Sequence, residues 1–539
     1  RAPEQLIALR ERAAGILAAQ GRWPDAVEQY QLANNWLAVK SLILRHAEEL
    51  LDQGRWQTLN QWFQGMPETL VAEDPWLLLW RSRCVETLQD VPGYLERALA
   101  LFGSKGDEPG QLRAISELLI APFLLGTSFA NFDSYLPVVE SNFERPRSEW
   151  DTSTAYLMIV LFRGGGSRSL AERAWRSVAA SASAEKLSGS LQLVATTILV
   201  HSALWLAQPT IGESALARIA SWLEQDELDP SARYFAIKDW GYWWFFDADY
   251  ARALPLYERA ADIARNTNLG SQRTVANCYR AMTLSMLGET KAAQEALEEA
   301  RTAPFSGGVL PRAYLGWASG VVAARSDLRA AFIHAQSSVA AARETGFSLL
   351  EAICLVLLIR YAIDLGELAE AAANLGRLQE LKRGGVWGFL DAIAPAIETE
   401  LHLRNNREAE ARQALALMLK EARAPRKAAW LNWVAAWLPR QLAIALEAGT
   451  EPETARELIR RFHVQAYSQG DSQWPWPVRI RAFSDFEIEV DGSPIVSKGK
   501  AQHKLLELLQ ILIALGAEHV SVAEICEWVW PDADGDTAA

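Results

Sequence analysis

Nearly the whole chain up to about residue 470 is a succession of helical stretches separated by short turns. The clearest unit runs to Ala260, with Gly241, Trp244, Ala253 and Tyr257 at the spacings of a tetratricopeptide hairpin. Small residues let two antiparallel helices approach closely, and aromatic residues fill the space beside them. The pattern therefore predicts stacked helical hairpins in this part of the chain.

A small residue that opens the second helix of each predicted hairpin recurs along the chain. It is found at Ala253, Ala293, Ala331, Ala371 and Ala411, at intervals of 40, 38, 40 and 40 residues. The interval exceeds the roughly 34 residues of a standard tetratricopeptide repeat, so longer helices are expected. Such a stack buries a continuous core and curves into a superhelix with a concave face. Residues 1–230 are also predicted to be helical, with less regular pairing.

The pattern changes to strand alternation at Val478. Residues 478–483 and 486–490 alternate apolar and polar, and Asp491-Gly492 is a hairpin turn signal. Two helices are predicted next, over 501–515 and 522–530. Strands followed by two short helices are typical of the first part of a winged helix-turn-helix, whose recognition helix and wing would come later. Pro475 and Pro477, which cannot continue a helix, indicate a linker before this domain.

The predicted fold class is therefore all-α: a tetratricopeptide-like helical-repeat superhelix with a small C-terminal α/β domain, a partial winged helix. We expect four parts. They are an N-terminal helical-repeat region (1–230), the repeat superhelix (231–467), a linker (468–477) and the partial winged-helix output domain (478–539).

Composition narrows the classes of function. The net charge of −13 argues against general binding of phosphate backbones by the whole chain. The four cysteines and seven histidines are scattered, which predicts reduced thiols in a cytoplasmic protein and no metal site. No apolar run is long enough to predict a membrane span. We find neither a catalytic set nor a phosphate-binding loop, so no enzyme and no cofactor are predicted for this chain.

Stretches at both ends of the chain resemble known regulator families. The N-terminal ones are similar to the helical-repeat region of the large ATP-binding (STAND) transcription regulators typified by the maltose regulon activator MalT: Gly21–Tyr30, Asn34-Asn35-Trp36, Gly54–Phe63 and Met66-Pro67-Glu68. The C-terminal ones are similar to the opening of the winged-helix domain of bacterial transcriptional activator (BTAD, OmpR-like) regulators: Arg479–Val490, Lys500-Ala501-Gln502, the 505–515 helix and Trp528–Asp534.

The resemblance implies a transcription regulator. Its helical repeats would act as a sensor and oligomerisation domain coupled to DNA-binding output, and ATP would bind an upstream module that is not in this chain. The implied partners are DNA through the complete winged-helix domain, a small-molecule or protein effector on the superhelix, and further copies of the chain. The alternative left open is a protein-binding repeat scaffold or adaptor.

Aromatic residues crowd one predicted hairpin, over residues 234–250. One helix cannot turn them all inward, because neighbours such as Trp243 and Trp244 lie about 100° apart around the axis. Some could therefore face a groove and stack on an effector, with packing between repeats as the alternative. The candidate effector-binding residues are Trp240, Trp243, Trp244 and Tyr250, with Arg233, Lys238 and Asp239 as polar contacts.

The C-terminal segment is acidic for a DNA-binding domain. From Val478 on, five basic residues stand against eleven acidic ones. We therefore predict that it forms the scaffold of the output domain rather than its DNA-reading surface. Lys498, Lys500 and His503 are the candidates for phosphate contact, with a solvated helix end as the alternative.

Overall fold

The computed structural model describes residues 2–53, 55–84, 90–143, 149–182, 189–205, 209–223, 230–267, 269–304, 306–468, 473–482, 486–490, 492–495, 500–516 and 520–530. The chain forms two compact units, Arg1–Ala436 and Trp437–Ala539.

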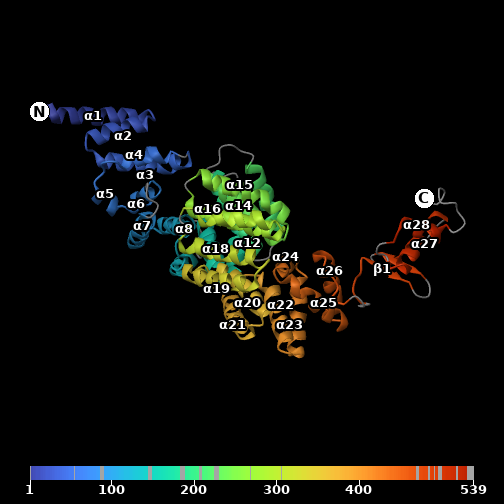
Figure 1. Cartoon of the computed structure of the whole chain (residues 1–539). Helices are drawn as coiled ribbons and strands as arrows, with labels where there is room; N and C mark the ends of the chain where they lie inside the picture. The colour runs from blue at the N-terminus through green and yellow to red at the C-terminus, as the bar shows by residue number, and fades with distance from the viewer. Residues whose placement is uncertain are drawn as a thin grey trace. The chain divides into compact units, whose positions relative to one another are not determined.

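The first unit is helical (Figure 1). Its helices are α1 (Ala2–Ala19), α2 (Trp23–Leu32), α3 (Trp36–Asp52), α4 (Trp56–Phe63), α5 (Glu68–Glu73), α6 (Pro75–Ser82), α7 (Val91–Lys105), α8 (Glu108–Leu125), α9 (Phe132–Asn142), α10 (Glu149–Arg163), α11 (Arg168–Ala182), α12 (Gly189–Trp205), α13 (Pro209–Leu223), α14 (Pro230–Phe246), α15 (Tyr250–Asn266), α16 (Gly270–Met286), α17 (Thr290–Arg301), α18 (Val309–Ala323), α19 (Leu328–Thr345), α20 (Ser348–Leu365), α21 (Leu368–Gly384), α22 (Leu390–Arg404), α23 (Glu408–Ala422) and α24 (Pro425–Ala429). A 3₁₀ segment, η2 (Trp430–Trp437), follows α24.

Consecutive helices from α14 onward pair as hairpins: α14 with α15, α16 with α17, α18 with α19, α20 with α21 and α22 with α23 (Figure 1). The first helix of a pair is buried on every side and the second on one side. Residues from Leu349 to Ile363 of α20 are almost all buried, whereas α21 buries Ala371, Leu375 and Leu378. A helix that is apolar all round must lie inside, so α20 and its equivalents form an inner layer.

The recurrent small residues lie where the repeat pattern requires them. The five alanines at the second-helix position are at most 2% exposed: Ala253, Ala293, Ala331, Ala371 and Ala411. A Cβ atom on Gly241 would come within 2.7 Å of the Tyr257 ring, so a larger residue would push α14 and α15 apart. The predicted tetratricopeptide-like repeat fold is confirmed.

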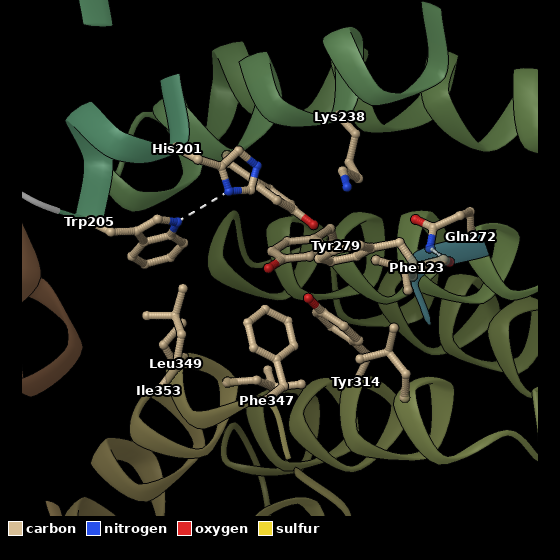
Figure 2. Close-up of a pocket in the computed structure, with 14 residues that line it drawn as sticks. Phe123, His201, Trp205, Lys238, Gln272, Tyr279, Tyr314, Phe347, Leu349 and Ile353 are labelled. Atoms are coloured by element: carbon tan, nitrogen blue, oxygen red, sulfur yellow. Dashed lines mark hydrogen bonds between the residues drawn. The ribbon is translucent and has the colours of Figure 1, made fainter. Parts of the chain in front are cut away.

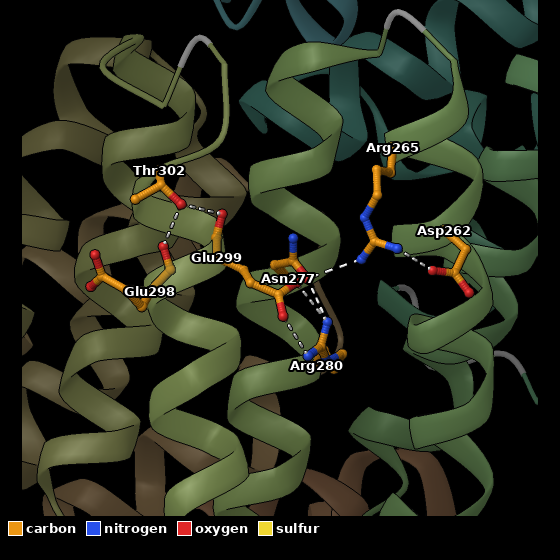
Figure 3. A network of polar contacts seen from close by, with 7 residues as sticks. All are labelled: Asp262, Arg265, Asn277, Arg280, Glu298, Glu299 and Thr302. Carbon is orange, nitrogen blue, oxygen red and sulfur yellow. Dashed lines mark hydrogen bonds and ion pairs between the residues drawn. The ribbon is translucent and has the colours of Figure 1, made fainter.

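Polar contacts on the outer layer join successive hairpins. Arg280 of α16 donates two hydrogen bonds to the carboxylate of Glu299 on α17, both of 3.1 Å, and Arg265 of α15 lies 3.6 Å from the same carboxylate (Figure 3). The hydrogen bonds from Arg280 hold the pKa of Glu299 below its usual value. One carboxylate thus connects three consecutive helices.

The superhelix curves until distant parts of the unit meet. The Trp387 indole N–H donates to the carbonyl oxygen of Leu161 over 2.8 Å, and the Gly388 N–H donates to that of Trp205 over 2.9 Å. The Phe129 N–H reaches the carbonyl oxygen of Thr345. Helices α8, α10 and α12 therefore contact the last repeats directly and help to enclose the interior.

The second unit contains α25 (Leu438–Glu447), α26 (Pro452–Phe462), β1 (Val478–Arg481), β2 (Glu487–Val490), β3 (Ser493–Pro494), α27 (Lys500–Ala514) and α28 (Val522–Val529). Its strands form an antiparallel sheet in the order β1-β2-β3, with Val478 opposite Val490. A capping box between Ser521 and Glu524 starts α28. The predicted small C-terminal sheet and its two helices are thus present.

The division between the units lies before α25, earlier than the linker expected at 468–477. Helices α25 and α26 contact each other, and they group with the sheet domain rather than with the repeats. Residues 469–472 of the expected linker are outside the described residues, whereas Trp474 is buried. The four-part domain division as a whole stays a prediction.

Candidate functional site

Two adjoining cavities lie on the inner layer of the first unit. The larger holds about 750 Å³ of space, its open mouth included, and is lined from α8, α10, α12 and α14. The smaller holds about 470 Å³ and lies among α12, α14, α16, α18 and α20 (Figure 2). Phe123, His201 and Lys238 line both. The enclosed volume of the larger cavity is about 130 Å³, close to that of an engineered apolar cavity of about 150 Å³ that binds benzene.

A buried polar cluster lies at the boundary of the two cavities. His201 Nε2 is 2.8 Å from Asp239 Oδ1, and Lys238 Nζ is 3.5 Å from the same oxygen. The Trp205 indole N–H donates to His201 Nδ1 over 3.3 Å (Figure 2). Since Nδ1 accepts, the proton of a neutral His201 is on Nε2, the ring nitrogen near Asp239. The charges of Lys238 and Asp239 compensate each other within the core.

Aromatic rings surround the Lys238 ammonium. Its Nζ lies 4.6 Å from the ring centroid of Phe235 and 5.1 Å from that of Tyr242. Burial lowers the pKa of Lys238, and the neighbouring Asp239 carboxylate opposes this effect. Burial also raises the pKa values of Tyr242, Tyr279 and Tyr314, so these hydroxyls stay protonated. The cavities therefore combine an apolar wall with one compensated ion pair.

The inner layer also holds a piece of the chain itself, residues 425–436, which we term the inner segment. Its Trp430 ring lies 4.3 Å from Phe389, 4.6 Å from Phe246 and 5.4 Å from Trp205, measured between centroids. Its Trp433 ring lies 5.7 Å from Phe245 and 6.0 Å from Trp317. Both tryptophans are buried.

Polar contacts fix the inner segment in register. Arg360 of α20 donates to the carbonyl oxygen of Trp433 over 3.0 Å, and the Asn432 amide donates to the Tyr250 hydroxyl over 2.7 Å. The Arg426 guanidinium lies 3.4 Å from the Asp247 carboxylate. Side chains and backbone of the segment are thus both recognised by the repeats.

The predicted effector residues fall in three places. Lys238 lines both cavities, and Asp239 lines the larger one. The other predicted effector residues line neither cavity. Trp243 and Tyr250 contact the inner segment. Trp244 lies under the guanidinium of Arg252, 4.7 Å from it, and Trp240 and Arg233 are half-buried. Much of the aromatic cluster thus serves packing between repeats, and a role in effector binding stays a prediction.

Other residues of the cavities were not expected from the sequence. His201, Phe123 and Phe162 come from helices whose pairing the sequence left open. The spacing of His201 and Trp205, one helical turn apart on an apolar stretch, was an available signal for a buried polar pair.

The candidate phosphate contacts are only partly described. Lys498 lies outside the described residues, as do residues 531–539, which include the last four residues of the Trp528–Asp534 stretch. The backbone of Lys500 starts α27, and His503 is exposed on the same helix. Lys504 Nζ donates to the carbonyl oxygen of Val529 over 2.8 Å and so joins α27 to α28. Contact with DNA stays a prediction for Lys498, Lys500 and His503.

Three further findings apply to the described residues. No group of three or more histidine, cysteine, aspartate or glutamate side chains among them could hold a metal ion. No helix among them combines the length and apolar character needed to cross a membrane. Burial raises the pKa of Cys84 to about 12, and Cys278 and Cys354 are also buried free thiols.

Comparison with known proteins gives limited similarity. No family model and no curated protein matches the chain. A crystal structure of Rap protein complexed with Competence and Sporulation Factor is 12% identical, with a TM-score of 0.38, and the match covers 59% of this chain and 93% of that one. The APC/C hetero-tetramer Cut9-Hcn1 is also 12% identical, with a TM-score of 0.33, over 80% of this chain and 98% of that one. Both TM-scores are low, so the fold described above rests on contacts within this chain.

Proposed function

We propose that the chain is a protein-binding helical-repeat scaffold whose inner layer holds an aromatic segment of its partner. The observation that carries this proposal is the inner segment, residues 425–436, which the repeats hold by buried tryptophans, by a hydrogen bond to its backbone and by one to its Asn432 side chain. A surface that recognises one such segment within the chain has the chemistry to recognise a similar one from another protein.

The contacts are of the kind that dominates protein interfaces. Tryptophan and arginine anchors in desolvated pockets contribute most of the binding energy in such interfaces. Trp430 and Trp433 are such anchors, and Arg426 adds a buried cation. In this proposal a partner segment replaces the inner segment, and the chain itself carries out no catalysis.

The test measures binding of a segment to the full chain. A fluorescein-labelled peptide with the sequence of residues 424–436 is titrated with the wild-type chain and with a Trp430→Ala/Trp433→Ala variant. The variant holds its own segment weakly, so we expect it to bind the peptide at least about tenfold more tightly than the wild type does, in line with the usual cost of losing two anchors. Fluorescence anisotropy gives both affinities.

A matched control replaces an exposed tryptophan. Trp56→Ala removes a ring that is 42% exposed and distant in sequence from the inner segment, and it should leave peptide binding as in the wild type. If the double variant fails to fold, Arg360→Ala and Asn432→Ala serve in its place. Each removes one hydrogen bond to the inner segment and leaves the aromatic packing intact, so each should also bind the peptide more tightly than the wild type does. Equal peptide binding by the wild type and all folded variants would remove the basis of the proposal.

A second candidate function is regulation of transcription, in which the C-terminal domain binds DNA. In this proposal the protein is cytoplasmic, and an upstream module binds ATP. The order of elements favours it, since an antiparallel sheet is followed by α27 and α28 with a capping box, as in the opening of a winged helix. The test is retention of genomic DNA fragments by the full-length protein. Retention that falls steeply with salt is expected, and its absence at low salt would exclude this role.

A further inference from the structure

We propose that the larger cavity binds a small, mainly apolar, uncharged molecule that carries both a hydrogen-bond donor and an acceptor, such as an aromatic or branched-chain carboxamide. The site is lined by α8, α10, α12 and α14, and it does not depend on the inner segment that carries the proposed function. The failure of either proposal therefore leaves the other standing.

The wall of the cavity selects the body of the ligand. Phe123, Met158, Leu161, Phe162 and Ile198 present aromatic and branched or flexible apolar side chains from three helices. The enclosed volume of about 130 Å³ accommodates a single ring or a branched chain with a short polar group, since an engineered apolar cavity of about 150 Å³ holds benzene. Burial of the apolar body against this wall provides the main driving force for binding.

A buried acceptor selects the donor on the ligand. Asp239 is 1% exposed and lines the cavity, and among the described residues its Oδ2 atom has no hydrogen-bond partner. Its Oδ1 atom faces His201. A buried carboxylate oxygen without a donor costs free energy, which a ligand N–H or O–H group aimed at Oδ2 recovers.

The paired charges of Lys238 and Asp239 exclude charged ligands, and Lys238 selects a hydrogen-bond acceptor on the ligand. Lys238 and Asp239 neutralise each other, so a ligand with a net charge would enter the core without a counter-ion and lose its hydration. The Lys238 ammonium lines the same cavity and donates to a carbonyl or similar oxygen. A carboxamide supplies the N–H for Asp239 and the carbonyl for Lys238 with no net charge.

The test compares three fluorinated probes on the full wild-type chain by ¹⁹F NMR titration: 4-fluorobenzamide, 4-fluorobenzoate and 4-fluorotoluene. They share a ring and differ in the polar group and the charge. We expect saturable binding of 4-fluorobenzamide, at least about tenfold tighter than that of the other two, since one satisfied buried hydrogen bond is worth about that factor. This comparison needs no variant and so does not depend on the folding of one.

Variants locate the binding. Ile198→Trp fills the cavity and should abolish binding of all three probes, while Ile333→Trp, at an exposed site on α19, should leave it unchanged. Asp239→Leu removes the acceptor and should abolish the preference for the amide, whereas Asp262→Leu on the surface of α15 should not. Thr197→Phe fills the same cavity from a half-buried position, should Ile198→Trp fail to fold.

Two outcomes would overturn the proposed binding site, and a third would overturn its preference for uncharged ligands. One is the absence of saturable 4-fluorobenzamide binding to folded wild-type chain. The other is binding that persists in the folded cavity-filling variants, which would place the probe elsewhere. Tighter binding of 4-fluorobenzoate than of the amide would refute the charge argument.

Discussion

The Arg426 guanidinium lies 3.5 Å from the ring centroid of Trp243. Both side chains are buried, and the contact joins the inner segment to α14. Trp243 was a candidate for stacking on an effector, and the group that stacks on it belongs to the chain itself. The aromatic chemistry expected at this position is therefore present, with an internal cation as its occupant.

The Arg426→Leu variant should loosen the inner segment. The substitution removes the cation–π contact and the ion pair with Asp247, at a cost of about 1–2 kcal/mol because the site is desolvated. Hydrogen–deuterium exchange of the amides of residues 425–436 should accelerate in the variant. Arg412→Leu is the control, because Arg412 is exposed and pairs within its own helix. Unchanged exchange in Arg426→Leu would show that the tryptophans alone hold the segment.

The His201→Leu variant should also affect the inner segment. His201 accepts the Trp205 indole N–H, and the Trp205 ring contacts Trp430, so loss of the acceptor frees the Trp205 side chain to reorient. We expect faster exchange in residues 425–436 and a cost of about 1–3 kcal/mol in the free energy of unfolding, because a buried donor is left unpaired. His334→Leu, in a partly exposed position on α19, is the comparison.

A pair of glycine substitutions tests the close approach of α18 and α19. A Cβ atom on Gly316 would lie 2.9 Å from Ser338 Cα, where backbone must move, whereas one on Gly376 of α21 meets no atom within 4 Å. Gly316→Ala should therefore destabilise the chain by about 1–3 kcal/mol. Gly376→Ala should stabilise it by up to about 1 kcal/mol through helix propensity. Chemical denaturation measures both, and stabilisation by Gly316→Ala would contradict the packing described.

The pH dependence of stability should reveal the Glu351 ion cluster. Burial alone would raise the pKa of Glu351, but hydrogen bonds and charges from Arg377 and Arg343 outweigh it and leave the pKa below its usual value. A carboxyl with a lowered folded-state pKa stabilises the fold above its unfolded-state pKa of about 4.3. That contribution is lost as pH falls through the folded-state value.

We therefore expect Glu351→Gln to cost about 2 kcal/mol at pH 7 and progressively less below about pH 4. Urea denaturation of both proteins from pH 7 to pH 3 measures the difference. Glu380→Gln is the matched control: Glu380 pairs with the same Arg377, but it is 59% exposed, so an effect below about 0.5 kcal/mol is expected. A cost for Glu351→Gln that does not depend on pH would assign the effect to packing rather than to charge.

Local sequence rules account for the repeats but not for the cavities. Neighbouring helices pack on each other through Gly241, Tyr257 and the recurrent alanines such as Ala253. Because these contacts are local, the spacing of the residues predicted the hairpins correctly. Phe123 of α8 lines the same cavities as Lys238 of α14 because the superhelix curves, and curvature accumulates from small rotations between repeats that no single spacing specifies. The inner segment was missed for the same reason, since the ring of Trp430 contacts that of Trp205, 225 residues earlier in the chain.

The hydrogen bond from Trp387 to the Leu161 carbonyl has a consequence for how the chain unfolds. In an open repeat array each hairpin contacts its neighbours, so such arrays fray from their ends in steps. Contacts between residues 226 positions apart along the chain join early and late repeats of this unit, and neither side can open without exposing the other. Residues 120–430 should therefore unfold in one cooperative transition. A destabilising substitution in any one repeat should lower the unfolding temperature of all of them.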